Sequence, residues 1–133
     1  MAEEPKLEIV APVFPVTDVK CATDYFTSKL LFDIAFEWAD EDGGPVSYVI
    51  LRSGNCELHL TMSEKPHKTI AYFFVRGVEE YHDAVRSNGA TITQDIKDWP
   101  WNMREFEVAD PDGNRLIFGQ DISRIKDGAA GEN

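Results

Sequence analysis

Residues 9–30, IVAPVFPVTDVKCATDYFTSKL, hold a short apolar run that passes directly into a segment with helical periodicity. The run Ile9–Val16 predicts a β-strand. The segment Asp18–Leu31 predicts a helix that starts at the capping residues Thr17 and Asp18, because its apolar residues recur at the spacing of one helix face: Val19, Ala22, Phe26 and Leu30. The stretch therefore predicts a strand followed by a helix.

A second unit of the same kind appears 59 residues later, when Val16 is aligned with Val75. It has a strand at Thr69–Val75 and a helix at Val78–Asn88, which Gly89 ends. Three β-rich stretches follow each helix: Phe32–Trp38, Ser47–Arg52 and Glu57–Met62, and then Ala90–Gln94, Arg104–Ala109 and Arg115–Gln120. The sequence thus predicts an α+β fold in which paired βαβββ modules form a curved mixed sheet around a cleft.

Length and composition predict one folded domain. A chain of 133 residues is about one domain, and a hydrophobic fraction of 43% is typical of a globular protein. We expect the domain to cover residues 7–122, with repeats at about 7–62 and 68–120. A disordered N-terminus is expected at 1–6 and a flexible tail at 123–133.

Charge and cysteine usage exclude several classes of partner. Thirteen basic and 24 acidic residues give a net charge of −11, which repels a phosphate backbone, so no nucleic-acid partner is expected. The same charge attracts cationic ligands, although solubility alone also explains it. No run approaches the ~20 apolar residues of a membrane span, and no signal core is present. Cys21 and Cys56 fit a reducing compartment, so a cytoplasmic protein without a membrane partner is expected.

Three motifs resemble one family. They are Pro15-Val16-Thr17-Asp18 and Val75-Arg76-Gly77-Val78, each before a helix, and Asp110-Pro111-Asp112-Gly113-Asn114 before the last strand. From Leu7 to Gln120 the chain resembles the vicinal-oxygen-chelate superfamily of glyoxalases, bleomycin-resistance proteins and extradiol dioxygenases. Pro100-Trp101 followed by Arg104-Glu105-Phe106 resembles the antibiotic-binding bleomycin-resistance proteins in particular. Leu31 departs from the family, which usually has glycine there as a helix cap.

The resemblance also implies where a metal would bind. Enzymes of this superfamily hold a divalent metal with His and Glu side chains, and three of those positions fall on Ala11, Ile70 and Ile117. These side chains have no lone pairs to donate. Only His59 lies at a position that glyoxalases fill with a ligand. We therefore expect no metal, no other cofactor and no catalytic residue.

Strand alternation predicts which side chains face the cavity. Glu57, His59 and Thr61 share one face of their strand, and Phe36 with Trp38 and Tyr72 with Phe74 share others. The resemblance implies that the residues at three positions line a crevice that stacks on flat heterocycles: Phe36, Tyr72 and Trp101. The predicted ligand-binding set is Phe36, Trp38, Glu57, His59, Thr61, Tyr72, Phe74 and Trp101. A purely structural histidine at position 59 and an ordinary core ring at position 36 stay open as alternatives.

These observations favour a non-catalytic small-molecule-binding protein of the bleomycin-resistance type, and hence a role in antibiotic resistance. The ligand is expected to be aromatic, and whether it is cationic stays open. The resemblance implies a homodimer with the crevice at its interface. A glyoxalase-like lyase or isomerase, or a thiol transferase, with a displaced metal site is the main alternative. An accessory or regulatory domain whose cavity is filled by its own side chains is a third.

Overall fold

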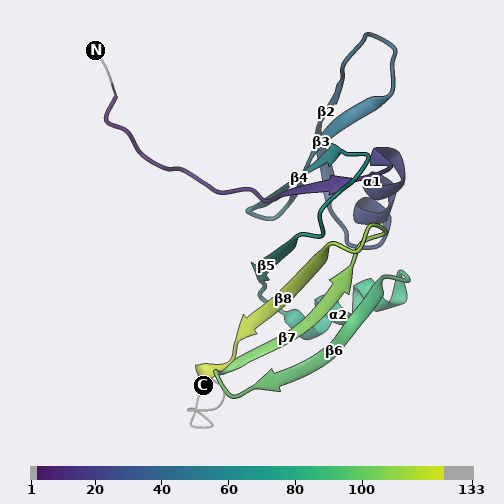
Figure 1. Ribbon diagram of the computed structural model, residues 1–133. Helices are drawn as coiled ribbons and strands as arrows, with labels where there is room; N and C mark the ends of the chain where they lie inside the picture. Colours follow the sequence, from purple (N-terminus) through teal and green to yellow (C-terminus); the bar gives the residue numbers. More distant parts are fainter. Residues whose placement is uncertain (1–2, 125–133) are drawn as a thin grey trace.

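The computed structural model describes residues 3–124 of the chain (Figure 1). In chain order its elements are β1 (Val13–Val16), α1 (Val19–Ser28), β2 (Asp33–Ala39), β3 (Val46–Ser53), β4 (Cys56–Met62), β5 (Ile70–Phe74), α2 (Val78–Ser87), β6 (Thr91–Trp99), β7 (Met103–Ala109) and β8 (Arg115–Asp121). This order confirms the prediction of two βαβββ modules. Neither α1 nor α2 is long and apolar enough to cross a membrane.

Each module builds its own four-stranded sheet, and both sheets have the same internal order. The first sheet runs β1-β4-β3-β2 and the second β5-β8-β7-β6. The outer pairs β1–β4 and β5–β8 are parallel, whereas the other pairs are antiparallel. The predicted α+β class with mixed sheets is confirmed. Within residues 3–124, however, backbone pairing does not join the two sheets, so the described part of the chain forms two sheets rather than one continuous sheet.

Helix α1 covers one face of the first sheet and α2 covers one face of the second, so neither of these two helices covers the other face. The predicted stripe of α1 is buried in the core, and Leu30 joins it just beyond the end of the helix. Beneath it lie buried alternate residues of three strands: Phe14 and Val16, Val49 and Leu51, and Leu58 and Leu60. Because side chains alternate along a strand, the residues between these point to the opposite face. That opposite face carries the candidate site.

The first strand begins later than its apolar run predicts. The predicted strand Ile9–Val16 is wrong in its first half, because β1 starts at Val13. Residues 3–12 instead form an extended arm that projects away from the body (Figure 1). Leu7 is 99% exposed and Val10 is 89% exposed. An apolar alternation marks a segment that can pair, but pairing also requires a neighbouring strand. Among the described residues 3–124, no strand pairs with the arm before its last residue, Pro12, whose carbonyl accepts from the His59 backbone nitrogen.

Strand β6 is longer than predicted. Its bounds are Thr91–Trp99, whereas the sequence predicted Ala90–Gln94. The second half carries charged residues, so its apolar pattern is weak. Pairing with β7 nevertheless continues, with Lys97 opposite Glu105 and Trp99 opposite Met103. Backbone pairing to a neighbour thus extends this strand beyond the reach of its own pattern.

One buried side chain connects the two modules. The Asn114 amide nitrogen donates to the Pro15 carbonyl at 3.1 Å and to an Asp110 carboxylate oxygen at 2.8 Å. Its amide oxygen accepts from the Thr69 backbone nitrogen at 2.8 Å, and Asn114 is fully buried. The nearby Asp112 carboxylate accepts from the Thr17 hydroxyl at 2.8 Å. The turn before β8 therefore joins the end of β1 to the start of β5.

Candidate ligand-binding crevice

The open face of the first sheet carries an aromatic and polar surface. Phe36 pairs with Ile50, and Trp38 pairs with Tyr48, across β2 and β3. Phe36 is 47% exposed and Trp38 is 53% exposed. Cross-strand partners lie on the same face, so these four side chains form one surface. We call this surface, together with Glu57, His59 and Thr61 of β4, the N-terminal half-site.

Within the N-terminal half-site, His59 is held from both sides. Its Nε2 lies 2.7 Å from Glu57 Oε2, and its Nδ1 lies 2.6 Å from the Tyr48 hydroxyl. The other oxygen of Glu57 accepts from Arg52 Nε at 3.2 Å. Hydrogen bonds from His59 and Arg52 lower the pKa of Glu57 below its ordinary value, so the carboxylate is charged at neutral pH. Sequence reasoning missed Tyr48, since the register that brings it to His59 depends on the hairpin.

The open face of the second sheet carries another aromatic surface. The Tyr72 and Phe74 rings of β5 lie with centroids 5.1 Å apart. The Tyr72 hydroxyl donates to Glu105 Oε2 on β7 at 2.6 Å. Burial and this bond to Glu105 raise the pKa of Tyr72 well above its ordinary value, so the phenol stays protonated. We call this surface, together with Trp101, the C-terminal half-site.

Trp101 stands in a tight turn between β6 and β7. The Asn102 backbone nitrogen donates to the Trp99 carbonyl at 3.0 Å, and Asn102 has a φ of 63°, which asparagine tolerates better than most residues. The Trp101 ring stacks on Trp99 with centroids 5.0 Å apart and planes 14° apart. Lys97 Nζ lies 4.0 Å from the centre of the Trp99 ring. Trp101 is 60% exposed, so part of its surface is free for a ligand. Trp99 was not assigned from the sequence as the stacking partner of Trp101. The signal was available, because the two tryptophans lie on either side of Pro100.

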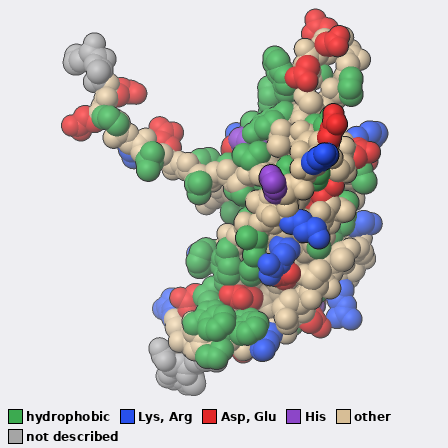
Figure 2. Space-filling model, in the orientation of Figure 1, with side chains coloured by type: hydrophobic (Ala, Val, Ile, Leu, Met, Phe, Trp, Pro, Cys, Tyr) green, Lys and Arg blue, Asp and Glu red, His purple; other side chains and the backbone are tan. Residues whose placement is uncertain are grey.

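The two half-sites do not meet within one chain. Among residues 3–124, none of the aromatic ring contacts joins Phe36 or Trp38 to Tyr72, Phe74 or Trp101. All five side chains are at least 39% exposed. Hydrophobic side chains are visible along the side of the molecule from which the arm projects (Figure 2). The structure therefore divides the predicted residues between the two sheets. Phe36 and Trp38 are exposed beside the half-buried Glu57, His59 and Thr61 in the first module, and the exposed Tyr72, Phe74 and Trp101 belong to the second.

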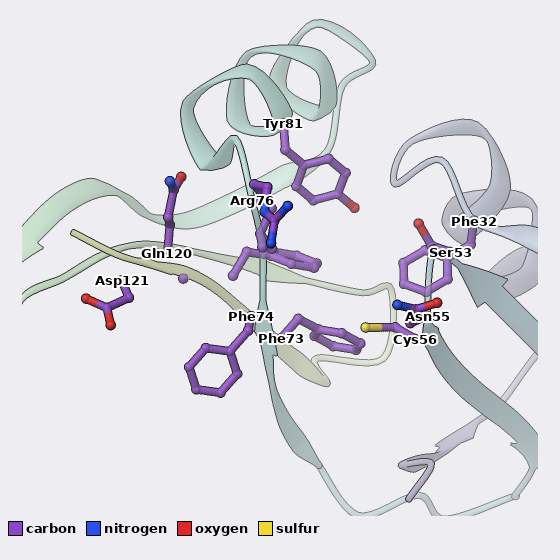
Figure 3. Close-up of a pocket in the computed structure, with 14 residues that line it drawn as sticks. Phe32, Ser53, Asn55, Cys56, Phe73, Phe74, Arg76, Tyr81, Gln120 and Asp121 are labelled. Atoms are coloured by element: carbon purple, nitrogen blue, oxygen red, sulfur yellow. The ribbon is translucent and has the colours of Figure 1, made fainter. Parts of the chain in front are cut away.

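A cavity of about 820 Å³ lies between the two modules (Figure 3). Its walls come from the β3–β4 turn and from the ends of β5 and β8, with Phe32, Cys56, Phe73 and Tyr81 among the lining residues. Arg76 and Asp121 add one cation and one carboxylate. Phe74 is the one predicted residue that also lines this cavity. The sequence pattern did not indicate this cavity, because it depends on how the modules sit against each other.

The metal of the superfamily's enzymes does not fit these residues. Two of the expected ligand positions, Ile70 and Ile117, carry aliphatic side chains that cannot bind a metal. They lie on the same face of the sheet, because Ile117 pairs with Tyr72. Ala11 lies in the arm, before β1 begins. Both nitrogens of His59 are already engaged by protein groups. In the part of the chain that the structure describes, no three His, Cys, Asp or Glu side chains form a group that could hold a metal ion.

Residues 8–118 match the family model of the Glyoxalase/Bleomycin resistance protein/Dioxygenase superfamily. The chain belongs to this superfamily. The match includes all three motifs. Two of them meet at Asn114, which donates to the Pro15 carbonyl and to the Asp110 carboxylate, so they join the two modules. The third motif contacts β8 instead, where the Gly77 and Val78 backbone nitrogens donate to the Gln120 side-chain oxygen.

This chain also aligns with individual members of the superfamily over nearly their whole length. A bleomycin resistance protein from Geobacillus stearothermophilus is 26% identical over 132 residues, covering 84% of this chain and 95% of the relative. A glyoxalase-related enzyme from Clostridium phytofermentans is 25% identical, with a TM-score of 0.76 over 91% of this chain and 100% of that one. The bleomycin-binding protein of Streptomyces verticillus, solved with copper(II)-bleomycin, is 24% identical, with a TM-score of 0.70 over 86% and 97%.

Proposed function

We propose that this protein is a homodimer that sequesters a planar aromatic ligand of the bleomycin type, without chemical conversion, in crevices between its subunits. The observation that carries the proposal is the pair of half-sites with exposed aromatic rings, between which no ring contact exists within residues 3–124. Two copies related by a two-fold axis place the N-terminal half-site of each against the C-terminal half-site of the other. The bleomycin resistance protein of Geobacillus stearothermophilus supports the ligand class.

The N-terminal arm supports the dimer. Its residues Leu7, Ile9 and Val10 are 68–99% exposed, although all three are apolar. The Pro12 carbonyl still accepts from the His59 backbone nitrogen at 2.9 Å, so the arm leaves the body directly beside the N-terminal half-site. An apolar extended segment is stabilised when it pairs with a partner. In this proposal the arm of each subunit pairs with the other subunit and adds apolar area to the interface.

The charge of the protein favours a cationic ligand. The net charge is −11, and Glu105 lies beside Tyr72 in the C-terminal half-site. A carboxylate next to an aromatic surface attracts a positively charged aromatic molecule. The same charge disfavours nucleic acid as a partner. We place the protein in the cytoplasm, where its free thiols Cys21 and Cys56 stay reduced.

An enzyme is the second candidate. The glyoxalase-related enzyme from Clostridium phytofermentans, 25% identical, is the observation that favours it. Such a function needs a metal or another reactive group away from the superfamily's usual positions. Elemental analysis of the purified protein separates the two candidates. A stoichiometric metal bound through His59 would favour the enzyme and contradict the binding proposal.

Tryptophan fluorescence titration with copper(II)-bleomycin tests the binding function. We compare Phe36→Ala with Ile34→Ala, because both residues lie on β2 and are 47% and 48% exposed. Ile34 pairs with Leu51, which lies in the core beneath α1. The Ile34 side chain is therefore on the helix-covered face of the sheet, opposite to the face that carries Phe36. Phe36→Ala is expected to weaken binding by about 1–3 kcal/mol, as loss of a stacking ring does elsewhere, while Ile34→Ala leaves it unchanged. Equal effects of the two substitutions would contradict the crevice.

A further inference from the structure

The N-terminal half-site contains a chain of three hydrogen-bonded side chains that the proposed function does not yet use. Glu57 Oε2 lies 2.7 Å from His59 Nε2, and His59 Nδ1 lies 2.6 Å from the Tyr48 hydroxyl. The Tyr48 and His59 rings meet edge to face, with centroids 5.4 Å apart. The side chains of His59 and Glu57 are 18% and 16% exposed, so the chain lies in a largely enclosed part of the open face.

The direction of these hydrogen bonds follows from the acid at one end. Arg52 donates to one oxygen of Glu57, which is charged, so the other oxygen must accept from His59. His59 Nε2 therefore carries the hydrogen, and in the neutral ring Nδ1 is an acceptor. The Tyr48 hydroxyl must then donate to Nδ1. Its own lone pairs are left as acceptors toward the open face.

We propose that Tyr48, oriented by Glu57 and His59, is a hydrogen-bond acceptor for an N–H group of the ligand, which is an ammonium, amidinium or amide group next to the aromatic part. This inference rests on the proposed crevice, since Tyr48 shares the open face with Trp38, its partner across the strands. Tyr48 is the ligand-contacting residue, whereas His59 and Glu57 are positioning residues. The arrangement selects ligands by hydrogen-bond direction as well as by shape and charge.

The substitution Glu57→Gln reverses the predicted direction. Arg52 Nε lies 3.2 Å from Glu57 Oε1 and needs an acceptor, so it holds the carbonyl oxygen of the new amide. The amide NH₂ then faces His59 and donates to Nε2. The histidine hydrogen moves to Nδ1, which donates to Tyr48, and the Tyr48 hydroxyl becomes free to donate toward the ligand. Two-bond ¹H–¹⁵N spectra of the His59 ring report this tautomer without any ligand. The Nε2-H form is expected in the wild type and the Nδ1-H form in the variant, and the same tautomer in both would contradict the relay.

A matched pair of probes tests recognition. Tryptamine and indole-3-propionate share one ring system and spacer, but the first ends in an ammonium and the second in a carboxylate. In the wild type, Tyr48→Phe is expected to weaken tryptamine binding about tenfold and leave indole-3-propionate unchanged. In the Glu57→Gln background the pattern is expected to reverse, with only indole-3-propionate losing affinity. Because both comparisons remove the same hydroxyl, the lost charge of Glu57 cancels within each background.

The outcomes separate this inference from the proposed function. An unchanged tryptamine affinity in Tyr48→Phe would overturn the role of Tyr48, even if Phe36→Ala still weakens binding of copper(II)-bleomycin. Tryptamine that does not bind the wild type at all would overturn recognition of an N–H donor in the same way. Loss of the Phe36 effect would instead contradict the crevice itself. Ile34→Ala, on the opposite face of β2, serves as the control with both probes.

Discussion

The Tyr72 ring of β5 lies over Gly119 of β8, and its hydroxyl reaches past this glycine to Glu105 of β7. A Cβ on Gly119 would collide with the Tyr72 hydroxyl and with the ring carbon that bears it. Strand β8 runs between β5 and β7, so a side chain at this point would fill the space that the phenol crosses. The missing side chain of Gly119 therefore holds the aromatic surface of the C-terminal half-site in place.

Gly119→Ala is expected to displace Tyr72 and weaken both folding and ligand binding. Overpacking of this kind costs about 1–3 kcal/mol, measured as the free energy of unfolding in urea. The double variant Gly119→Ala/Tyr72→Leu provides the control, because the shorter side chain no longer reaches the new methyl group. It should recover stability relative to the sum of the two single changes. Additive effects of the two substitutions would contradict the predicted clash.

The end of α1 carries backbone strain that substitution can relieve. Leu31 has a φ of 66°, a left-handed conformation that costs a residue with a branched or bulky side chain on the order of 1 kcal/mol. Because Leu31 is half-exposed, little packing is lost when it is replaced. We expect the free energy of unfolding to rise by up to about 1 kcal/mol in Leu31→Gly and to fall in Leu31→Val. The opposite order in thermal or urea unfolding would contradict this account of the helix end.

Acid should weaken the second sheet through Glu107. Two hydrogen bonds from Arg115, at 2.7 and 3.0 Å, and one from Thr93, at 2.7 Å, hold its carboxylate. The hydrogen bonds from Arg115 are the largest cause that lowers the pKa of Glu107 below its ordinary value of 4.5. Because the folded-state pKa is the lower one, this stabilisation is fully present above pH 4.5 and is lost as the pH falls through the folded-state value.

The variant Glu107→Gln is therefore expected to be less stable than the wild type at pH 7 and to lose less stability between pH 4.5 and lower values. Urea unfolding at a series of pH values measures this. Glu64→Gln, at an exposed position between β4 and β5, removes the same charge without removing these hydrogen bonds. Parallel pH profiles for Glu107→Gln and the wild type would show that Glu107 does not carry the acid response.

Much of the fold could be predicted, because each module repeats a local pattern. The apolar stripes of α1 and α2 and the turn residues between strands fix the element order. Strand alternation correctly assigned Leu58 and Leu60 to the buried face of β4 and His59 to the other face. The start of β1 was not predictable. The arm has the alternation of a strand, but whether it pairs depends on a neighbour that its own residues do not specify.

The candidate site was only partly accessible from the sequence, for related reasons. Alternation assigns a face to Tyr48 but not a partner, since its contact with His59 depends on the register of β3 and β4. The register of β2 and β3 shifts twice along the hairpin, so counting residues from the turn fails there. The role of Gly119 appears only when a side chain from β5 is seen to cross β8. Interactions that depend on register or on three strands at once are not visible in a one-dimensional pattern.

A subunit-mixing titration tests most directly the claim that each crevice is built from two subunits. Phe36→Ala damages the N-terminal half-site and Trp101→Ala the C-terminal half-site, so each variant alone should bind copper(II)-bleomycin weakly. After mild unfolding and refolding together in equal amounts, random pairing should give mixed dimers in which one crevice has both rings intact. Our account predicts that about one quarter of all crevices regain wild-type affinity in the fluorescence titration. No recovery in the refolded mixture, or a monomeric mass by light scattering at micromolar concentration, would contradict it.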